Sequence, residues 1–583
     1  MTVKHKTVLF AYAVIAITAL LLFNNLFYSF CWSDEGFYLS TVNRMMTGER
    51  LFIDDWSPTQ SYEPLLYPLY ALFIKIVGST DGIYLFFRIA TLFFQVLTAV
   101  AAYCIFSKKM RRSASLTLAL VALIFARACI NGPSYYVIGC ETYLLGIVAL
   151  YAFFELHRHR LFLFISGIFF ALAVLCNPYL ALVYITVSAA LLIFSATRKR
   201  WKLWLCIWAG TVFVAVIYIA AVLYKTDPVS ILKSLKYIFN DPAYGRKPIH
   251  TIKRLYKCPR LILFPYVITN LPMIAAYIAV LKKRIALTPK TKPLLFLLNT
   301  ILLVVNGIVI EKDCGAFIMA FFHYGIFTAL LFSPYTLKKA AVEYKRELLY
   351  FIIPGLILSY FFCYASDTGF GVCSIGMVVV SGGIASVYIQ SFENAFPSEK
   401  ISNRLLKYLP LAIIVCGTFF YRVNLTYRDI RLFPHIAFIP SRHPATEKIT
   451  QGPAKGLYTG SIYKRQYDSI LHTLERIDTE KGDTIFISQL APWAYLVDKN
   501  LACGAPTTWR LPPSDYRIEP YYEDFAGHRL PDYILFLDKS IRDNDNEISG
   551  NEWIIRRLNE CGYVQTSVAC GILYAAKRKG YAE

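Results

Sequence analysis

Apolar runs long enough to cross a bilayer recur along the chain from Val8 to Tyr421. Each is close to the ~20 residues that a bilayer core requires of a helix. Connections rich in Lys and Arg alternate with connections that lack such clusters, and the basic clusters are 108–112, 157–160, 198–202, 282–284, 338–346 and 400–407. Because short basic loops stay cytoplasmic, the alternation predicts about thirteen spans with the amino terminus inside and the carboxyl terminus outside.

From roughly residue 422 the pattern changes, and no further apolar run of that length follows. Residues 482–487 and 532–537 read as buried strands bounded by turn residues, whereas 467–477 and 552–561 have helical periodicity. The sequence therefore predicts a polytopic α-helical membrane domain over residues 1–422. A soluble α/β domain is expected to follow over residues 423–583, outside the membrane.

Composition supports the membrane assignment and excludes some other classes. Hydrophobic residues make up 56% of the 583, and mean hydropathy is +0.47. The net charge of +22 lies in the connections between apolar runs rather than in one patch, which argues against a nucleic-acid partner. The 14 cysteines form no CxxC and no His/Cys cluster with zinc spacing, although a disulfide outside the membrane stays open.

Acidic residues are scarce in the apolar region and gather in one connection. Of the 18 Asp and Glu within residues 1–422, seven lie between Asp34 and Asp81. The alternation makes this connection, residues 31–83, the first loop outside the membrane. Within it, residues 36–46 and 65–77 are expected to form helices lying on the membrane surface. We therefore look for the chemistry of the protein in this loop.

A series of motifs in and just after this loop reads Asp34-Glu35-Gly36-x-Tyr38, Met46-x-Gly48, Asp54-x-Trp56, Glu63-Pro64-Leu65-Leu66-Tyr67, Gly78 and Arg88. It resembles the first periplasmic loop of the GT-C superfamily of glycosyltransferases, which includes protein O-mannosyltransferases and lipid A aminoarabinose transferases. The resemblance implies a GT-C type fold. The chain departs from the aminoarabinose transferases because Glu63 is not followed by their lysine.

The resemblance implies a glycosyltransferase that moves a sugar with inversion from a polyprenyl-phosphate-linked donor to an acceptor hydroxyl. Asp34 is then the expected general base, because a carboxylate at the membrane surface can take the proton of the attacking hydroxyl. Glu35 is a second catalytic candidate that orients the base or the donor. Expected cations for the donor phosphate are Arg88, Lys225, Arg246 and Lys247, and candidate contacts to donor or acceptor are Asp54, Asp55, Glu63 and His323.

Each of these assignments has a simpler alternative. Asp34 is also a good helix N-cap, Arg88 could anchor a span at the head groups, and His323 could be an ordinary interior histidine. Asp54 and Asp55 fit a turn. At the level of the whole protein, the alternatives are a transporter or flippase of lipid-linked saccharides and a non-catalytic scaffold that displays the tail.

The expected partners and location follow from the same reading. They are a polyprenyl-phosphate sugar donor, membrane lipid, and a cell-envelope glycan, lipid or protein as acceptor. No cofactor is required; a divalent metal is permitted by two separated carboxylate pairs but is not predicted. The expected location is the bacterial cytoplasmic membrane.

Overall fold

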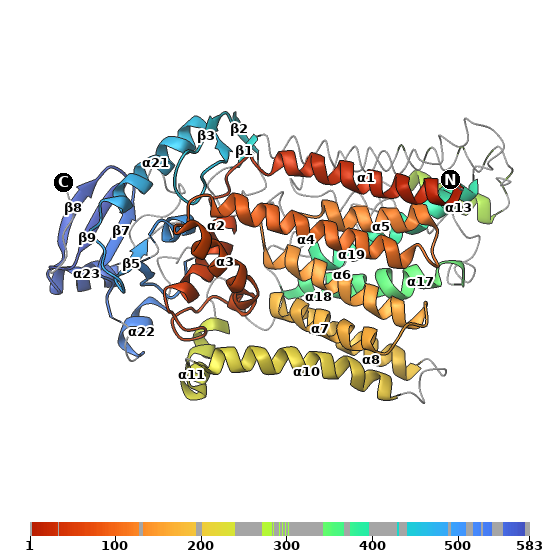
Figure 1. Cartoon of the computed structure of the whole chain (residues 1–583), viewed down its shortest axis with the longest axis horizontal. Coiled ribbons are helices and arrows are strands. Elements are labelled where there is room, and N and C mark those ends of the chain that lie inside the picture. The colour runs from red at the N-terminus through yellow and green to blue at the C-terminus, as the bar shows by residue number, and fades with distance from the viewer. Residues whose placement is uncertain are drawn as a thin grey trace.

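The computed structural model describes most of the chain. The described residues are 3–32, 34–126, 132–193, 201–224, 226–239, 271–282, 342–365, 374–395, 428–430, 440–487, 491–498, 500–508, 517–525, 529–538 and 552–577, with isolated residues between 284 and 301. Long helices lie side by side in one half of the molecule, and a small sheet lies at the other end (Figure 1).

The helical half is built mainly from apolar helices that run alongside one another (Figure 1). They are α1 (Val3–Asn25), α4 (Ile83–Phe106), α5 (Arg112–Ile124), α6 (Tyr135–Phe154), α7 (Leu161–Cys176), α8 (Leu182–Ile193), α10 (Trp201–Leu223), α13 (Leu271–Leu281), α18 (Ile353–Ala365) and α19 (Ser374–Ala395). Short helical segments join some of them: η3 (Pro178–Ala181), α17 (Lys345–Glu347) and the π-helical η4 (Leu348–Ile352).

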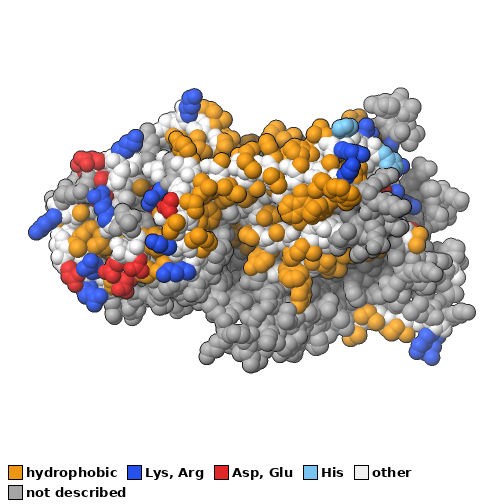
Figure 2. Space-filling model, turned by 90° about the horizontal axis from the view of Figure 1, so that it is seen from below, with side chains coloured by type: hydrophobic (Ala, Val, Ile, Leu, Met, Phe, Trp, Pro, Cys, Tyr) orange, Lys and Arg blue, Asp and Glu red, His pale blue; other side chains and the backbone are white. Residues whose placement is uncertain are grey.

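Four of the described helices are long and apolar enough to cross a membrane, namely Val8–Asn25, Ile83–Phe106, Tyr135–Phe154 and Trp201–Leu223. Their outward residues are exposed apolar side chains, such as Leu20 on α1 and Val216 on α10, which are 69% and 60% exposed. Hydrophobic side chains spread across the middle of the molecule, and charged ones lie toward its two ends (Figure 2). Such a belt is stable only against lipid, so the protein is a membrane protein.

The total of about thirteen spans stays a prediction. Expected spans ending near Phe106, Leu156, Cys176, Phe194 and Leu223 correspond to α4, α6, α7, α8 and α10. Those expected to end near Ile310, Leu331 and Tyr421 lie outside the described residues.

The first loop contains the two predicted helices, α2 (Asp34–Met46) and α3 (Glu63–Val77), joined through the short η1 (Gln60–Tyr62). Pro64 in the first turn favours the start of α3, and Gly78 ends it with a left-handed φ of 79°. The expectation that α2 lies on the membrane surface is wrong: every residue from Glu35 to Arg44 is buried. The helix packs between α3 and η7 (Pro492–Leu496) of the tail, so both of its sides are covered.

The tail is the predicted α/β domain. Its five-stranded sheet has the order β6-β5-β7-β9-β8, where the strands are β5 (Thr484–Ile487), β6 (Ala502–Cys503), β7 (Tyr533–Leu537), β8 (Val564–Val568) and β9 (Gly571–Ala575). The predicted buried strands are the parallel pair β5 and β7 at its centre. Three helices accompany the sheet, namely α21 (Ser461–Glu475), α22 (Ile518–Glu523) and α23 (Glu552–Glu560). Two small antiparallel strand pairs precede it in sequence, β1 (Arg428–Ile430) with β2 (Pro440–Pro444) and β3 (Glu447–Lys448) with β4 (Tyr458–Thr459).

The tail and the first loop share one hydrophobic core. Phe30 meets the rings of Tyr467 and Trp493 edge-on at 5.4 and 5.9 Å, and Trp32 contacts Trp493 at 5.2 Å. The backbone N–H of Tyr458 donates to the carbonyl of Phe27 at 2.7 Å. The composition of the chain therefore changes near residue 422. The hydrophobic core does not follow that boundary, because the tail and the first loop pack together.

Polar contacts join the same two segments. The N–H of Trp56 donates to the carbonyl of Pro506 at 2.7 Å, and the hydroxyls of Ser57 and Thr507 lie 2.8 Å apart. Ser40 of α2 donates to the Thr508 hydroxyl at 2.8 Å. Residues 505–508 therefore lie along the first loop, about 450 positions away in sequence.

A cross-linking experiment tests this arrangement. In a cysteine-depleted protein, the pair Ser57→Cys and Thr507→Cys should form a disulfide on mild oxidation, because the native hydroxyls are 2.8 Å apart and buried. Peptide mass spectrometry would detect the linked peptides. Ser57→Cys with Ser567→Cys is the control, since Ser567 lies on β8, the edge strand at the far end of the tail (Figure 1). Equal cross-linking in both pairs, or none in the first, would contradict the packing of the tail on the loop.

Candidate functional site

The first acidic pair begins α2 and meets the loop end of the helical bundle. Glu35 accepts two hydrogen bonds from the guanidinium of Arg88 on α4, with Nε–Oε1 and Nη2–Oε2 distances of 2.6 Å. Both side chains are buried, at 1% and 3% exposure. Gly132, just before α6, lies against Glu35, where a methyl group would come within 3.1 Å of its Cγ. The pair therefore joins α2 to the ends of α4 and α6.

The remaining donors of Arg88 hold the chain that leaves α1. Its Nη1 donates to the carbonyls of Leu26 and Tyr28 at 2.6 and 3.2 Å, and its Nη2 to the carbonyl of Ser29 at 2.9 Å. A guanidinium has five N–H groups, so all of them are used inside the protein. A phosphate could bind Arg88 only by replacing one of these contacts, and the expected contact to the donor phosphate stays a prediction. Arg88 is also buried, which does not fit an anchor at the head groups.

Asp34 differs from its neighbour in exposure. It is the first residue of α2 and is partly exposed, whereas Glu35 is buried and ion-paired. The two carboxylates are thus placed for different tasks. Glu35 fixes the start of the helix, and Asp34 is carried by it at the solvent side.

The second acidic pair is split by the turn in which it lies. Asp54 accepts from Arg50 three times, from its backbone N–H at 2.6 Å and from its side chain at 3.1 and 3.0 Å. Asp55 turns inward, accepts the N–H of Ser57 at 2.7 Å and lies 3.8 Å from Nη1 of Arg44. Asp54 therefore serves the turn, while Asp55 faces the interior.

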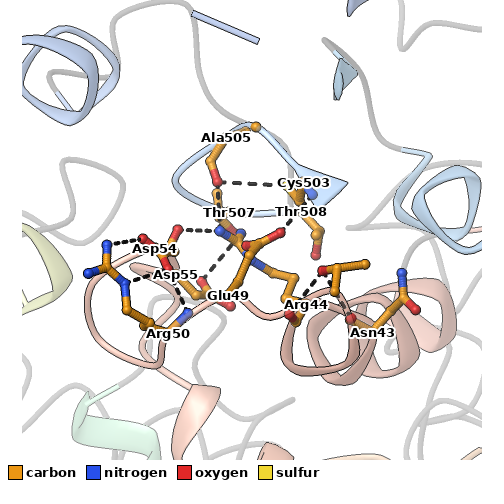
Figure 3. A network of polar contacts seen from close by, with 12 residues as sticks. Asn43, Arg44, Glu49, Arg50, Asp54, Asp55, Cys503, Ala505, Thr507 and Thr508 are labelled. Atoms are coloured by element: carbon orange, nitrogen blue, oxygen red, sulfur yellow. Dashed lines mark hydrogen bonds and ion pairs between the residues drawn. The ribbon is translucent and has the colours of Figure 1, made fainter. Parts of the chain in front are cut away.

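Arg44 is the centre of a polar network that joins the loop to the tail (Figure 3). It pairs with Glu49 at 2.5 Å and donates to the carbonyls of Asp54 and Ala505, the latter at 2.9 Å. Glu49 accepts the N–H of Cys503 at 2.7 Å. Burial raises the pKa of Glu49 to about 8, against the lowering effect of Arg44. This network could not be predicted from the sequence, because residues 36–46 were expected to form a helix on the membrane surface and the covering tail is remote in sequence.

Glu63 begins α3 and is fully buried. No N–H or O–H of the described residues reaches either of its carboxyl oxygens, and the group beside it is the carboxyl of Asp55. Burial, followed by the negative charge of Asp55, raises the pKa of Glu63 well above the ordinary value. Glu63 therefore keeps its proton to a higher pH than an ordinary glutamate does.

The remaining predicted site residues, Lys225, Arg246, Lys247 and His323, lie outside the described residues. Within the described part, no group of three or more His, Cys, Asp or Glu side chains could hold a metal ion. Four described cysteines outside the predicted spans, Cys31, Cys503, Cys561 and Cys570, form no disulfide with one another.

Comparison with known proteins gives structural likenesses alone. No protein-family model and no curated protein matches the chain. The chain is similar to the oligosaccharyltransferase of Archaeoglobus fulgidus in its apo form, with 12% identity, a TM-score of 0.48, and coverage of 97% of this chain and 74% of the other. A structure of AglB from Archaeoglobus fulgidus with an inhibitory peptide and a dolichol-phosphate gives 12% identity, 98% and 74% coverage, and a TM-score of 0.47.

The same oligosaccharyltransferase in complex with Zn and sulfate has a TM-score of 0.48 and 12% identity, and covers 97% of this chain and 73% of the other. At this identity and TM-score, such a likeness does not by itself establish an activity. The function of this chain must follow from its own residues.

Removing either partner of the Glu35–Arg88 pair should strongly destabilise the protein, because the other charge would be left buried and unpaired. We expect Arg88→Gln and Glu35→Gln each to cost about 3–5 kcal/mol of unfolding free energy. The double variant should cost less than the sum of the two.

Unfolding in lipid nanodiscs would measure these costs. The control is Lys455→Gln, which removes an exposed pair with Asp81 at 3.4 Å and should cost about 0–1 kcal/mol. Single variants as stable as wild type would show that the pair does not hold the loop.

The buried proton of Glu63 should make stability depend on pH. Below the ordinary glutamate pKa of 4.5, Glu63 is protonated whether the protein is folded or unfolded. Above it the unfolded chain releases the proton while the folded protein retains it, so stability should fall as pH rises, by up to ~1.4 kcal/mol per pH unit for one proton. Thermal unfolding between pH 5 and 7.5 should show a smaller decline in Glu63→Gln than in wild type. An unchanged slope in this variant would mean that Glu63 is already ionised.

Proposed function

We propose that the protein is an inverting glycosyltransferase of the GT-C type. It moves a sugar from a polyprenyl-phosphate-linked donor to an acceptor hydroxyl at the outer face of a bacterial cytoplasmic membrane. The observation that supports this function is the position of Asp34, a partly exposed carboxylate held at the loop end of the bundle by the buried Glu35–Arg88 pair. The acceptor is a cell-envelope glycan, lipid or protein.

In the proposed reaction, the acceptor oxygen attacks the anomeric carbon of the donor sugar. The bond between that carbon and the phosphate oxygen breaks, and its electron pair leaves with the polyprenyl phosphate. Asp34 takes the proton of the attacking hydroxyl, which is the task of a general base. Attack from the face opposite the leaving phosphate inverts the anomeric configuration.

The division of labour between the two carboxylates follows from their surroundings. A base must be ionised and reachable, and Glu35 is neither exposed nor available, since both of its oxygens are bonded to Arg88. A fixed neighbour is useful to a base, because small displacements of a catalytic group are costly to the rate. Glu35 and Arg88 therefore act as positioning residues for Asp34.

The leaving phosphate requires cations, and the proposed ones beyond Arg88 are Lys225, Arg246 and Lys247. The segment between these residues includes α11 (Pro228–Phe239), which is described and lies against the first loop. Its Tyr237 stacks on Trp56 with ring centroids 4.7 Å apart, and its hydroxyl donates to Asp524 at 3.3 Å. This contact places α11 itself against the first loop, and the proposal takes the basic residues that precede and follow α11 in the sequence as the cations for the phosphate.

The alternative of a transporter has one specific observation in its favour. Glu141 is a fully buried carboxyl within the apolar helix α6, beside Thr98 and Gln95 of α4. Ionisable groups within spans often mark transport paths. One such carboxyl among the described residues does not make a path across the membrane, so we rank this function second.

A transfer assay tests the proposal. Purified protein in nanodiscs should move labelled sugar from polyprenyl-phosphate donors to acceptors in membrane extracts, which a transporter would not do. Asp34→Asn should fold and retain donor binding, but transfer should fall by the ~10²- to 10⁴-fold typical of a lost general base.

The matched control is Asp81→Asn in the same loop, because Asp81 is partly exposed and pairs with an exposed lysine. It should transfer at the wild-type rate. Near wild-type transfer by folded Asp34→Asn under saturating substrates would exclude Asp34 as the base.

A further inference from the structure

The first loop and α10 contribute several buried polar atoms without hydrogen-bond partners. They are both carboxyl oxygens of Glu63, Oδ2 of Asp55, Nη1 of Arg44 and the hydroxyl of Tyr218. Glu63, Asp55 and Arg44 are only 0%, 2% and 2% exposed, respectively. A folded protein rarely leaves buried donors and acceptors unpaired, and each such group calls for an explanation.

These groups come from separate elements but interact with one another. Nη1 of Arg44, on α2, lies 3.8 Å from Oδ1 of Asp55 in the turn. The carboxyl of Glu63, on α3, lies beside that of Asp55 and within the field of Arg44. The Tyr218 hydroxyl of α10 is influenced in turn by the charge of Glu63. Three elements of the loop and one apolar helix thus bring buried polar atoms within electrostatic reach of one another.

We propose that Asp55, Glu63, Tyr218 and Arg44 form a subsite for the hydroxyl groups of the donor sugar. Arg44 and Tyr218 offer donors, Asp55 offers an acceptor, and a carboxylic acid at Glu63 offers both. A sugar hydroxyl both donates and accepts, so neighbouring hydroxyls on one ring match this mixed set. The identity of the ligand as a donor rests on the proposed transferase function.

The position of the subsite favours the donor over the acceptor. Tyr218 lies five residues before the end of α10 at Leu223, which is about 8 Å along the helix. Its ring is partly exposed although its hydroxyl is buried, and its neighbours Ile217 and Ile219 are exposed apolar residues. A sugar linked to a membrane lipid approaches from this side, whereas an acceptor arrives from the aqueous side.

The charge of the subsite argues against a cation as its occupant. The described acids at this place are Asp55, Glu63 and Glu49, and Arg44 lies 3.8 Å from Asp55 and 2.5 Å from Glu49. Burial raises the pKa of Glu63, which lowers the negative charge that would attract a metal. A neutral, hydroxyl-bearing ligand satisfies these groups without adding charge to a buried place.

Lipid binding to the full-length protein in nanodiscs tests the subsite, with mannosyl and glucosyl polyprenyl phosphates as probes and bare polyprenyl phosphate as reference. Native mass spectrometry would give the affinities. Wild type should bind at least one sugar-bearing lipid more tightly than the bare lipid. Tyr218→Phe and Glu63→Met, each of which removes the hydrogen-bonding group of its side chain, should weaken that binding by ~3- to 10-fold and leave the bare lipid unaffected, as expected for one lost hydrogen bond.

Matched controls separate a subsite from a general effect on folding. Tyr224→Phe removes a hydroxyl from an 84% exposed tyrosine just after α10, and Glu475→Gln changes an exposed glutamate of the tail; neither should alter binding. Asp34→Asn should bind the sugar-bearing lipid like wild type. Sugar-dependent binding without any transfer by wild type would support the subsite and reject the transferase, so the two proposals can fail separately.

Three results would overturn the subsite. The first is equal loss of sugar-bearing and bare lipid in Tyr218→Phe and Glu63→Met, which indicates a structural role. The second is unchanged binding in both variants or no preference for sugar in wild type. The third is loss of Mn²⁺ binding in these variants with sugar-bearing lipid unaffected, which would indicate a cation site.

Discussion

The buried ion pair between Glu35 and Arg88 is the interaction on which the arrangement of the loop depends. Taking two charges out of water is costly, and it is tolerated only when geometry is good and the remaining donors are satisfied. Here the guanidinium meets the carboxylate with two bonds of 2.6 Å, and its other N–H groups satisfy the carbonyls of Leu26, Tyr28 and Ser29. One side chain thus fixes the end of α1, the start of α2 and the start of α4.

The same constraint explains why a glycine follows Glu35. A methyl group at Gly36 would come within 2.8 Å of the backbone nitrogen of Trp493 and of the Tyr84 hydroxyl. Only a residue without Cβ lets α2 approach the tail and α4 this closely. The close approach buries α2 on all sides, and its polar residues must then find partners in the tail, as Asn43 does by donating to the carbonyl of Tyr495 at 3.0 Å. The tail is therefore part of the structure that holds the acidic loop.

The sequence predicted those features that depend on local chemistry. Long apolar runs gave the helices, Pro64 and Gly78 marked the ends of α3, and short runs rich in β-branched and aromatic residues gave β5 and β7. Features that depend on remote contacts could not be predicted. The sequence predicted α2 as a surface helix because nothing local shows that η7, some 450 residues later, covers its other side.

The directions of side chains likewise could not be predicted from the sequence. Asp54 and Asp55 are chemically identical neighbours, yet one is bonded to Arg50 and the other turns toward Arg44. Tyr218 lies in a long apolar run and looks no different there from a lipid-facing tyrosine. Only the positions of α3 and α10 relative to each other bring it under the electrostatic influence of Glu63.

The acidic loop illustrates how one fold assigns different states to similar carboxyls. Glu35 is paired with a bidentate arginine, burial beside Asp55 raises the pKa of Glu63, and Asp34 is left partly exposed at a helix start. A transferase needs such a division, because a base must carry charge at the reacting hydroxyl while groups that bind a neutral sugar must not attract cations or repel the leaving phosphate. Burial sets the state of each group, and burial in turn depends on the tail packed over the loop. The α/β domain therefore contributes to the proposed chemistry through the protonation of the loop beneath it.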